Sequence, residues 1–407
     1  MTLIVQKYGG TSVGSIDLIR AVAGKIAAQR AHGAQVVVVV SAMGDHTDRL
    51  VDLAKGVCAE PEPREMDVLL STGEQVSIAL LAMALNACGC RARSYTGAQV
   101  RVLTSPMPTR ARILGIDTAR LQSDLDAGLV PVVAGFQGVS EQGDITTIGR
   151  GGSDTTAVAL AVALKADECQ ILTDVDGVYT TDPRMVPDAR RIERISFEEM
   201  LELAGQGARV MHLRAVEFGA KYNLPIRVLS TFNPGAGTLI CREEEHVEAP
   251  VVAGIAFNRD EAELTVTGLP DTPGVAVGML KPVSDAAIEV DMIVLNAPRD
   301  GKVDLSFTVH RDDFAAALRL VRAAAGGFAD ARVTGDDRVA KLSVVGVGMR
   351  SHAGVATRLF ETLARENTRV RMITTSEIRI SVLIEEAALE RSVRSLHATF
   401  GLAAARN

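Results

Sequence analysis

Short runs of branched apolar residues alternate with longer helical patterns over residues 1 to about 245. The run Val36–Val40 is five consecutive valines, which is typical of a strand buried on both faces of a parallel sheet. Similar runs predict strands at Leu3–Val5, Leu129–Phe136 and Gln170–Thr173. The patterns between them predict helices at Ile16–Arg30, Gln75–Cys88 and Thr155–Lys165. This alternation indicates a layered α/β fold.

From Glu263 onwards the pattern changes. A series of strand, loop, helix, strand, strand, helix and strand ends near Thr334, restarts at Ala340 and runs to about Thr399. In both copies the first loop ends in Gly-Val-Ala and leads into a helix. The region therefore contains an internal repeat of roughly 70 residues, which predicts two βαββαβ units.

Two features predict how these parts join. The segment Cys241–His246 is charged and marks a boundary. The second repeat lacks its last strand, and Pro250–Phe257 is predicted to supply it, so that the two units interlock. We expect a first domain at residues 1–245, a linker and strand at 246–262, a first repeat unit at 263–337 and a second at 338–407.

The composition excludes several classes of protein. Apolar residues make up 47% and charged residues 23% of the chain, which rules out a disordered or collagen-like protein. The net charge of −7 predicts no affinity for nucleic acid or anionic membranes. No apolar run approaches the roughly 18 residues of a membrane span, and no signal peptide is visible. The five cysteines lack metal-site spacing, so we expect reduced thiols and a cytoplasmic location.

Several polar, glycine-rich segments follow predicted strands or precede predicted helices. Because ligands bind at the carboxyl ends of strands in open α/β sheets, these segments are candidates for one site. In Lys7–Gly14, glycines let the backbone approach an anion and a lysine adds a positive charge. The segment is neither a Walker A loop nor a dinucleotide fingerprint, and a plain turn is the alternative.

The next two segments also have structural alternatives. Ser41–Gly44 follows the valine strand and is either a ligand loop or a polar turn, with Thr47 within reach. Ser71–Glu74 leads into the helix predicted at Gln75–Cys88, and Ser, Thr and Glu are all favoured at a helix N-terminus. The other interpretation is that Glu74 holds the ammonium group of a substrate. The spacing leaves both open.

Two later segments are more informative. Thr146–Asp154 combines glycines with an arginine, a serine and an aspartate, which predicts an anion site where Arg150 binds a carboxylate. The alternative for Asp154 is an N-cap. Thr173–Arg184 carries three aspartates, a tyrosine and an arginine that suit a nucleotide, with Asp-Gly and Asp-Pro turns as the alternative. The seven histidines form no paired motif, and we assign none a catalytic role.

Together these features resemble the aspartate kinases, which belong to the amino-acid-kinase superfamily and carry two C-terminal ACT domains. The resemblance spans the whole chain in family order and rests on Lys7–Val13, Ser41–Gly44, Gly73-Glu74, Gly149–Asp154, Thr173–Asp176, Tyr179–Arg184, Leu269–Gly274 and Thr374–Ser381. It implies a three-layer αβα domain with a mainly parallel sheet, followed by two ferredoxin-like units. It also implies MgATP-dependent phosphorylation of the L-aspartate side chain to 4-phospho-L-aspartate, the first step of lysine, threonine and methionine biosynthesis.

The resemblance assigns roles by position. Lys7 would stabilise the transferred phosphoryl group, and Asp154 would orient Lys7 or join the metal shell. Aspartate would be held by Thr47, Glu74, Arg150 and Ser153. ATP would be bound by Lys7, Tyr8, Gly9, Gly10, Ser41, Thr173, Asp174, Tyr179, Thr180, Thr181, Asp182, Pro183, Arg184, Arg209 and Val210. At Arg209 the family usually has lysine, and arginine is not an equivalent replacement.

In the family, ACT domains bind lysine, threonine or both between paired units and inhibit the enzyme. The matching positions are Asp271, Thr272, Pro273, Gly274, Val275, Ala276, Glu289, Val290, Asp291, Asn296, Val355, Ala356, Arg369, Val370, Ser376 and Glu377. Some members also make an ACT-only product from an internal start, and Val247 lies where such a start would fall. We therefore expect a homodimer, or an α₂β₂ tetramer whose small subunit begins near Val247.

There are two rival interpretations, one within the enzymes and one from another class. Another amino-acid kinase, acting on glutamate, acetylglutamate or a nucleoside monophosphate, would as a rule lack tandem ACT repeats. An amino-acid sensor with an inactive kinase domain would be free to lose Lys7, Glu74, Arg150 and Asp174, all of which are present. The repeat and the intact set favour an aspartate kinase.

Overall fold

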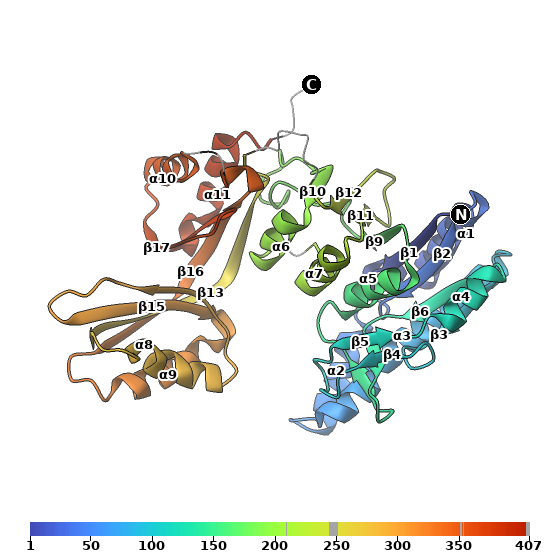
Figure 1. Cartoon of the computed structure of the whole chain (residues 1–407), viewed down its shortest axis with the longest axis horizontal. Helices are drawn as coiled ribbons and strands as arrows, with labels where there is room; N and C mark the ends of the chain where they lie inside the picture. The colour runs from blue at the N-terminus through green and yellow to red at the C-terminus, as the bar shows by residue number, and fades with distance from the viewer. Residues whose placement is uncertain (209, 244–250, 351, 353, 404–407) are drawn as a thin grey trace. The chain divides into compact units, whose positions relative to one another are not determined.

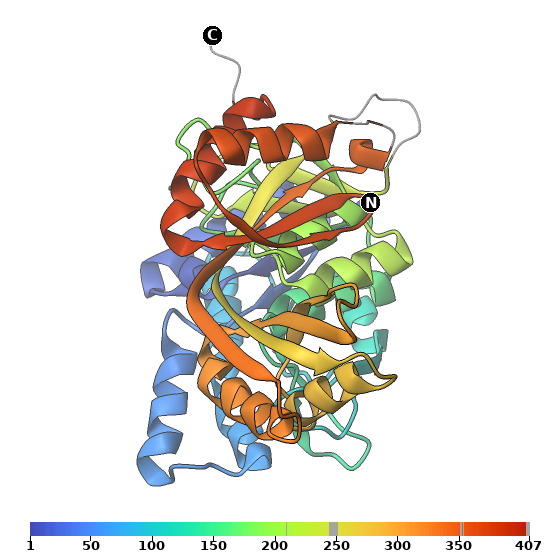
Figure 2. The same ribbon diagram turned by 90° about the vertical axis from the view of Figure 1, so that its left-hand side faces the viewer.

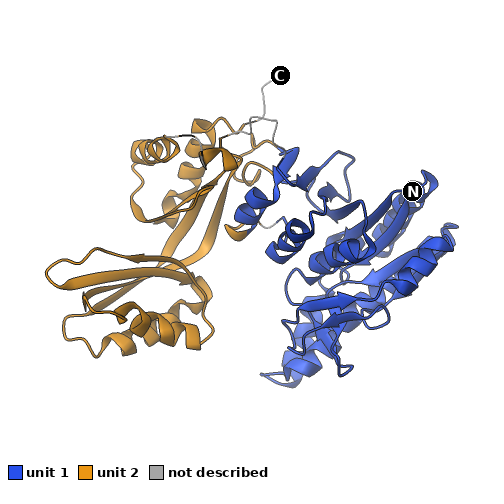
Figure 3. Ribbon diagram, in the orientation of Figure 1, with its two compact units in different colours: residues 1–178, 191–204, 209–247 blue, residues 179–190, 205–208, 248–407 orange. Residues whose placement is uncertain are grey.

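The computed structural model describes all residues except 209, 244–250, 351, 353 and 404–407. It divides into two compact units (Figure 3): unit 1 contains residues 1–178, 191–204 and 209–247, and unit 2 contains residues 179–190, 205–208 and 248–407. Two short stretches from the first 245 residues thus fold with the C-terminal part of the chain. Arg209 and Val247, singled out above, lie outside the described residues.

Unit 1 is built around an eight-stranded sheet (Figure 1). Its strand order is β10-β12-β11-β9-β1-β2-β6-β3, and every neighbouring pair is parallel except β11 and β12. The strands are β1 (Leu3–Tyr8), β2 (Gln35–Val40), β3 (Ala92–Tyr95), β6 (Val130–Ala134), β9 (Glu168–Thr173), β10 (Arg194–Ser196), β11 (Ile226–Ser230) and β12 (Thr238–Cys241). The mainly parallel sheet predicted from the apolar runs is confirmed.

Helices cover the sheet, and a smaller sheet adjoins it. The helices are α1 (Ile16–Ala31), α2 (His46–Val57), α3 (Pro63–Ala87), α4 (Ala119–Asp126), α5 (Gly152–Leu164), α6 (Phe197–Gly205) and α7 (Leu213–Tyr222). The second sheet has the order β5-β4-β7-β8, with β4 at Val102–Thr104, β5 at Ile113–Ile116, β7 at Gln137–Val139 and β8 at Ile145–Thr147. The short β8 matters for function because it leads directly into the glycine-rich segment before α5.

The valine strand β2 lies between β1 and β6, and all five valines are buried. Because side chains alternate across a strand, Val36, Val38 and Val40 face the core formed with α1 and α3. The intervening valines face the opposite side of the sheet, where α5 packs against β1, β2 and β9. The poly-valine pattern therefore reflects burial by helices on both faces.

Helix α3 differs from its prediction, because it begins at Pro63 and not at Gln75. The Glu62 side chain caps it by accepting a hydrogen bond from the Glu65 amide (3.0 Å), and Pro63 is favourable in the first turn. By length and composition α3 could cross a membrane. Half of its apolar stretch is buried inside the protein, however, and it carries buried Asp67 and Glu74, so it is a core helix.

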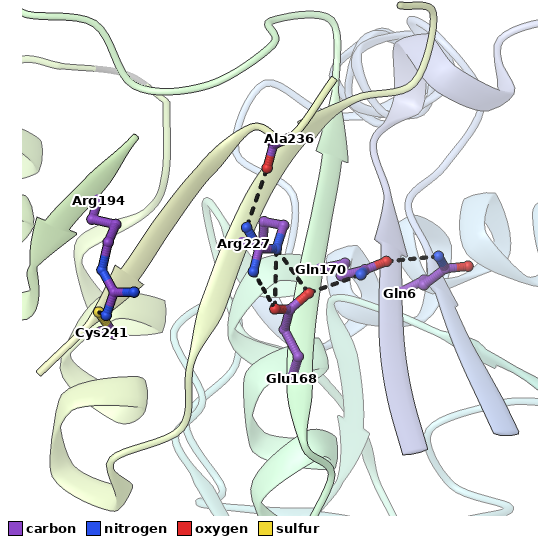
Figure 4. A network of polar contacts seen from close by, with 7 residues as sticks. All are labelled: Gln6, Glu168, Gln170, Arg194, Arg227, Ala236 and Cys241. Atoms are coloured by element: carbon purple, nitrogen blue, oxygen red, sulfur yellow. Dashed lines mark hydrogen bonds and ion pairs between the residues drawn. The ribbon is translucent and has the colours of Figure 1, made fainter. Parts of the chain in front are cut away.

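Polar side chains connect neighbouring strands of the large sheet (Figure 4). The guanidinium of Arg227 on β11 forms a bidentate pair with Glu168 on β9, with a shortest contact of 2.8 Å. Gln170 donates to the same carboxylate (2.8 Å), and Gln6 on β1 donates to Gln170 (2.9 Å). The network thus ties together three adjacent strands, including the strand that ends at Lys7 and Tyr8.

Unit 2 contains one antiparallel six-stranded sheet in the order β14-β15-β13-β16-β18-β17. Its strands are β13 (Gly254–Pro270), β14 (Val290–Leu295), β15 (Lys302–His310), β16 (Arg332–Val345), β17 (Val370–Thr375) and β18 (Arg379–Glu385), and its helices are α8 (Val275–Asp285), α9 (Phe314–Ala325), α10 (Val355–Arg365) and α11 (Leu389–Thr399). Gly254–Asn258 pairs with Lys341–Val345, the position of a last strand for the second repeat. The long strands β13 and β16 run through both repeats (Figure 2).

Residues 179–190 belong to the core of the second repeat. Met185, Val186 and Ala189 are buried there together with residues of α10 and α11. The backbone carbonyl of Thr180 accepts a hydrogen bond from the Ile255 amide (2.7 Å). This segment comes shortly after strand β9 of the large sheet in sequence, yet its packing partners come from the last part of the chain.

Candidate active site

A pocket of about 340 Å³ opens at the carboxyl ends of β1 and β2 in unit 1. Every residue predicted to act in catalysis or to hold the amino-acid substrate lines it, together with two of the predicted phosphate-binding residues. Its lining consists of Lys7, Gly10, Ser41, Ala42, Gly44, Thr47, Glu74, Phe136, Gly149, Arg150, Gly151, Gly152, Ser153 and Asp154. Segments far apart in the sequence thus meet at one edge of the sheet, as expected for an α/β fold.

Lys7 and Asp154 form an ion pair at the base of this pocket. The Lys7 Nζ lies 2.7 Å from Asp154 Oδ1, and each side chain is only 12% exposed. The N-cap of α5 is Gly151, so Asp154 is not the cap but lies in the first turn. Its carboxylate therefore has a different use, which is to hold the lysine ammonium at the end of β1.

The loop after β1 approaches the loop after β2 very closely. The Gly44 amide donates to the Gly10 carbonyl (3.0 Å). A Cβ on Gly10 would lie 2.7 Å from the Ala42 carbonyl oxygen, so no other residue fits without moving the backbone. The two turns together form one wall of the pocket, with Ser41 and Thr47 on the same wall.

Glu74 lies inside α3, which excludes the N-terminal interpretation of Ser71–Glu74. Its side chain is 3% exposed, and its Oε1 accepts a hydrogen bond from the Ala42 amide (3.1 Å). Its Oε2 is buried and has no hydrogen-bond partner among the described residues. Burial raises the pKa of Glu74 to about 7, although hydrogen bonds from backbone amides partly oppose the rise. Such a carboxylate is suited to receive a cationic group.

Arg150 lies on an exposed turn between β8 and α5, and Ser153 lies buried in the first turn of α5. Both line the pocket. The turn keeps its shape partly through its own backbone, since the Gly152 amide donates to the Gly149 carbonyl (2.9 Å). An exposed guanidinium beside a helix N-terminus favours an anionic group such as a carboxylate.

The residues predicted to bind ATP are distributed more widely. Thr173 is the last residue of β9 and Asp174 follows it, beside the β1 loop: the Gly9 amide donates to the Leu172 carbonyl (3.1 Å), and the Thr173 hydroxyl donates to Asp174 (3.0 Å). Tyr8 is fully buried, and its hydroxyl contacts Gln6 (3.2 Å), which makes its side chain part of the core. Val210 is half-buried in a turn before α7.

The predicted ATP residues Tyr179–Arg184 lie in unit 2. Thr180 is fully buried; its hydroxyl donates to the Leu402 carbonyl (3.1 Å) and lies 2.9 Å from Nε2 of His397. Thr181 is also buried, and Tyr179 packs against the core of the second repeat. Arg184 pairs with Asp182 (2.9 Å) and lowers the pKa of that carboxyl. Of this segment, Asp182, Pro183 and Arg184 are the better placed for a soluble ligand.

The predicted effector residues occupy corresponding places in the two repeats. One set surrounds the start of a helix, at Asp271–Ala276 before and within α8 and at Val355 and Ala356 in α10. The other set lies on or beside the edge strands of the sheet, at Glu289–Asp291 and Asn296 for β14 and at Arg369, Val370, Ser376 and Glu377 for β17. Asp291 is paired with Lys341 on β16.

Four residues near the pocket were missed by sequence reasoning. Asp67, on α3, is fully buried and accepts hydrogen bonds from the amide and hydroxyl of Thr147 (2.9 and 2.6 Å). Its signal was the spacing of Asp67, Ser71 and Glu74 on one helix face, which is visible only if the helix begins at Pro63.

His212 and Arg214, at the start of α7, contact the turn that carries Arg150. Phe136, which also lines the pocket, is the last residue of a predicted strand and carries no other signal.

Within the part of the chain that the structure describes, no group of three or more His, Cys, Asp or Glu side chains is arranged to hold a metal ion. A larger cavity of about 550 Å³ beside β3 and α4 contains none of the predicted residues. Its Asp124 is already bound by Arg93 (2.8 Å) and by the Tyr95 hydroxyl (2.7 Å). The chemistry predicted from the sequence is therefore concentrated in the smaller pocket.

Known proteins match this architecture over its whole length. The amino acid kinase family model matches residues 2–230, and an ACT domain model matches residues 342–400. An aspartate kinase of Pseudomonas fluorescens is 60% identical over 405 residues, which cover 99% of this chain and 98% of that protein. An aspartokinase of Mycolicibacterium smegmatis is 48% identical over 407 residues, covering 99% and 97%.

Solved structures agree with this result. Escherichia coli aspartokinase III in complex with aspartate and ADP, described as the R-state, has a TM-score of 0.82 at 27% identity and covers 98% of this chain and 99% of that one. The same enzyme in complex with lysine and aspartate, described as the T-state, has a TM-score of 0.78 at the same identity and coverage. The chain therefore belongs to the aspartate kinase family, with an amino acid kinase domain followed by ACT domains.

Proposed function

We propose that the pocket binds L-aspartate and the terminal phosphoryl group of ATP, and that the products are 4-phospho-L-aspartate and ADP. The observation that carries this proposal is the arrangement of Lys7, Glu74, Arg150 and Asp154 around one cavity of about 340 Å³. Aspartate has an ammonium group and two carboxylates, so its recognition needs charges of both signs. The complex of E. coli aspartokinase III with aspartate and ADP supports the assignment.

Each side chain has a role that follows from its charge and burial. Glu74 presents a buried oxygen that has no hydrogen-bond partner in the part of the chain that the structure describes, which suits the substrate ammonium. Arg150 binds the α-carboxylate as a bidentate donor. Thr47 and Ser153 supply hydroxyl groups to the same substrate. The side-chain carboxylate of aspartate then points towards Lys7 and the phosphoryl group.

The reaction needs no general base, because a carboxylate nucleophile is already ionised at neutral pH. The protein's contribution is to position the two substrates and to neutralise charge on the phosphoryl oxygens. Lys7, held by Asp154, supplies a fixed positive charge at that place. The Gly10 amide and the Ser41 hydroxyl complete the phosphate-binding wall, next to Gly9, whose own amide is bonded to the Leu172 carbonyl.

Mg²⁺ is the expected companion of ATP in phosphoryl transfer, and it prefers carboxylate and phosphate oxygens. Two carboxylates line the pocket, and Glu74 is assigned to the ammonium group, so Asp154 is the one that fits the metal shell. When bound, the ion neutralises charge on the phosphates. On the protein side, Asp174 and Thr173 extend the nucleotide site beyond β9, and Asp182 and Arg184 are assigned to ATP by resemblance.

We further propose that lysine, threonine or both inhibit the enzyme by binding to the effector positions of the ACT repeats. The T-state complex of E. coli aspartokinase III with lysine supports this proposal. Inhibition requires that the effector bind one of two states more tightly than the other. The enzyme would then act in the cytoplasm at the entry to lysine, threonine and methionine synthesis, as a homodimer or as an α₂β₂ assembly.

Aspartyl hydroxamate formation from L-aspartate, MgATP and hydroxylamine tests the reaction, and adding lysine and threonine tests the regulation. Turnover that the two amino acids suppress supports both proposals. Turnover without suppression leaves the kinase assignment in place and excludes lysine and threonine as inhibitors. Turnover with glutamate in place of aspartate would contradict the substrate assignment.

A further inference from the structure

The turn that carries Arg150 is supported from outside. Arg150 itself is exposed, and the glycines on either side, Gly149 (φ 84°) and Gly151 (φ 69°), leave the backbone in a region that other residues avoid. A guanidinium on such a turn would sample many positions unless neighbouring elements fixed the backbone. The structure shows those neighbours on both sides of Arg150.

On the N-terminal side, Arg214 in the first turn of α7 is hydrogen-bonded to the backbone two residues before Arg150. Nη1 of Arg214 donates to the Ile148 carbonyl (2.9 Å), and Nη2 donates to the Ala111 carbonyl (3.3 Å). The guanidinium therefore bridges two loops of the same unit. Burial lowers the pKa of Arg214, but the group stays charged at any physiological pH, and both its bonds are charge-assisted.

On the C-terminal side, the imidazole of His212 lies against Gly151. A Cβ on Gly151 would come within 2.2 Å of His212 Cγ, so the ring occupies the space that a side chain at residue 151 would need. Nδ1 of His212 is buried and has no hydrogen-bond partner among the described residues. The ring thus acts on the turn by packing and not by a hydrogen bond through that nitrogen.

We propose that Arg214 and His212 are positioning residues for aspartate binding, which fix the turn 148–151 so that Arg150 meets the substrate carboxylate. Arg214 holds the backbone before Arg150, and His212 holds it after. Neither residue lines the pocket, so neither touches the substrate directly. The inference rests on the proposed role of Arg150, and the experiment below separates the two.

The first test compares Arg214→Gln with Lys221→Gln, a control that removes one positive charge from an exposed position on the same helix. We expect Arg214→Gln to raise the KM for aspartate about tenfold or more, because a small misplacement of a binding group has a large effect. The KM for MgATP and kcat should change by less than about threefold, as expected for lost ground-state binding. Lys221→Gln should leave all three unchanged.

A double-mutant cycle with Arg150→Ala shows whether Arg214 acts through Arg150. In the Arg150→Ala background, Arg214→Gln should have no further effect on the KM for aspartate. An equal loss in both backgrounds would overturn the proposal, as would a fall in kcat with the KM for aspartate unchanged. If Arg150→Ala alone leaves that KM unchanged, the role of Arg150 itself is wrong.

His212 has its own test, because a packing role and a hydrogen-bonding role predict different effects of the same two substitutions on the KM for aspartate. His212→Leu fills most of the ring's volume without its nitrogens and should keep the KM for aspartate within about threefold. His212→Ala should raise it further, because the support behind Gly151 is lost. Equal damage by both variants would contradict a packing role.

Thermal unfolding followed by circular dichroism accompanies every variant. Should Arg214→Gln fail to fold, Arg214→Lys is measured instead. Lysine keeps the charge but reaches one carbonyl and not two, so an intermediate KM for aspartate is expected. Loss of folding in both variants would assign Arg214 to stability and would overturn the proposal.

Discussion

Lys7 and Asp154 are the pair of side chains on which the proposed chemistry depends most. Both are nearly buried, and the 2.7 Å contact between them leaves the lysine ammonium facing the pocket. A charge fixed in advance, in a place from which water is mostly excluded, stabilises a developing negative charge much better than a mobile one.

Replacing Lys7 with methionine should therefore reduce kcat by about 10²-fold or more, with a smaller change in the KM for aspartate. The hydroxamate assay measures the loss. Lys55→Met, on the exposed last turn of α2, is the control and should retain full activity. If the Lys7→Met enzyme has the kcat of the unmodified chain, Lys7 has no role in the chemical step.

Glu74 predicts a dependence of aspartate binding on pH. Its pKa is raised to about 7 by burial, so in the free enzyme the carboxylate becomes protonated as the pH falls through 7. A protonated Glu74 cannot pair with the substrate ammonium. The KM for aspartate should therefore rise as the pH is lowered from 8 to 6, and Glu74→Gln should have a high KM that no longer varies over this range. A pH profile unchanged by the substitution would contradict the role.

Glu74 also predicts how the stability of the fold depends on pH, and the direction is opposite to that for aspartate binding. The folded state holds the Glu74 proton up to about pH 7, whereas the unfolded chain releases it near the ordinary value of 4.5. The folded state thus binds more protons between these values, and stability falls as the pH rises through this window. At pH 8 Glu74→Gln should be the more stable protein, by up to roughly 3 kcal/mol, and at pH 4 the difference should vanish.

At the scale of elements, an ion-pair cluster joins the two ACT repeats. Lys341 on β16 is 3% exposed; it pairs with Glu261 on β13 (3.2 Å) and with Asp291 on β14. The three residues come from three different strands of one sheet. Strand β14 belongs to the first repeat, so the cluster is a side-chain link between the repeats in addition to the shared strands.

Lys341→Met should destabilise unit 2 by about 3–5 kcal/mol, because it leaves the buried Glu261 carboxylate without its counter-charge. The midpoint of urea unfolding measures the effect. Lys281→Met is the matched control, since the Lys281–Asp285 pair is exposed on α8 and should contribute about 0.5 kcal/mol or less. Equal shifts for the two variants would show that burial does not matter here.

The local sequence pattern predicts the type of an element where its burial is uniform, as in the valine strand β2 and the apolar helix α5. It does not predict the start of α3, because that start is marked by the cap at Glu62 and Pro63 and not by the apolar run that begins later. This error also affected the prediction of the site. Because the helix was predicted to begin at Gln75, Asp67 could not be placed on the same helix face as Glu74. The pocket's charged residues were predictable because each has a position in a motif, whereas Arg214 and His212 act through contacts that no local spacing encodes.

At the scale of the whole molecule, the two units do not follow the order of the chain. Residues 179–190 interrupt the kinase sequence and fold with the second repeat, where Met185 and Val186 are buried. Residues 205–208 behave likewise: Gln206 accepts a hydrogen bond from Ser343 on β16 (3.2 Å). A boundary drawn at residue 245 from composition alone misses both, because their partners lie far away in the sequence, beyond that boundary.

A fragment of residues 1–247 should therefore aggregate or express poorly, because it exposes apolar side chains that the full chain buries. Co-expression with residues 248–407 should restore a stable complex, which size-exclusion chromatography would detect. The control is the same fragment with Met185→Ser and Val186→Ser, which should be more soluble alone but should bind the second fragment less well. A monodisperse 1–247 fragment with the activity of the full chain would contradict this picture.

The placement of residues 179–190 also sets an order of events during synthesis. Their partners on α11 and at Leu402 leave the ribosome about 200 residues later, which at about 5–20 residues per second means roughly 10–40 seconds. During that time the kinase sheet can form, but the core that buries Met185 and Val186 is still incomplete. A nascent chain that stops before α11 lacks the final part of this core, so the burial of residues 179–190 is completed only when the last helix of the second repeat has been made.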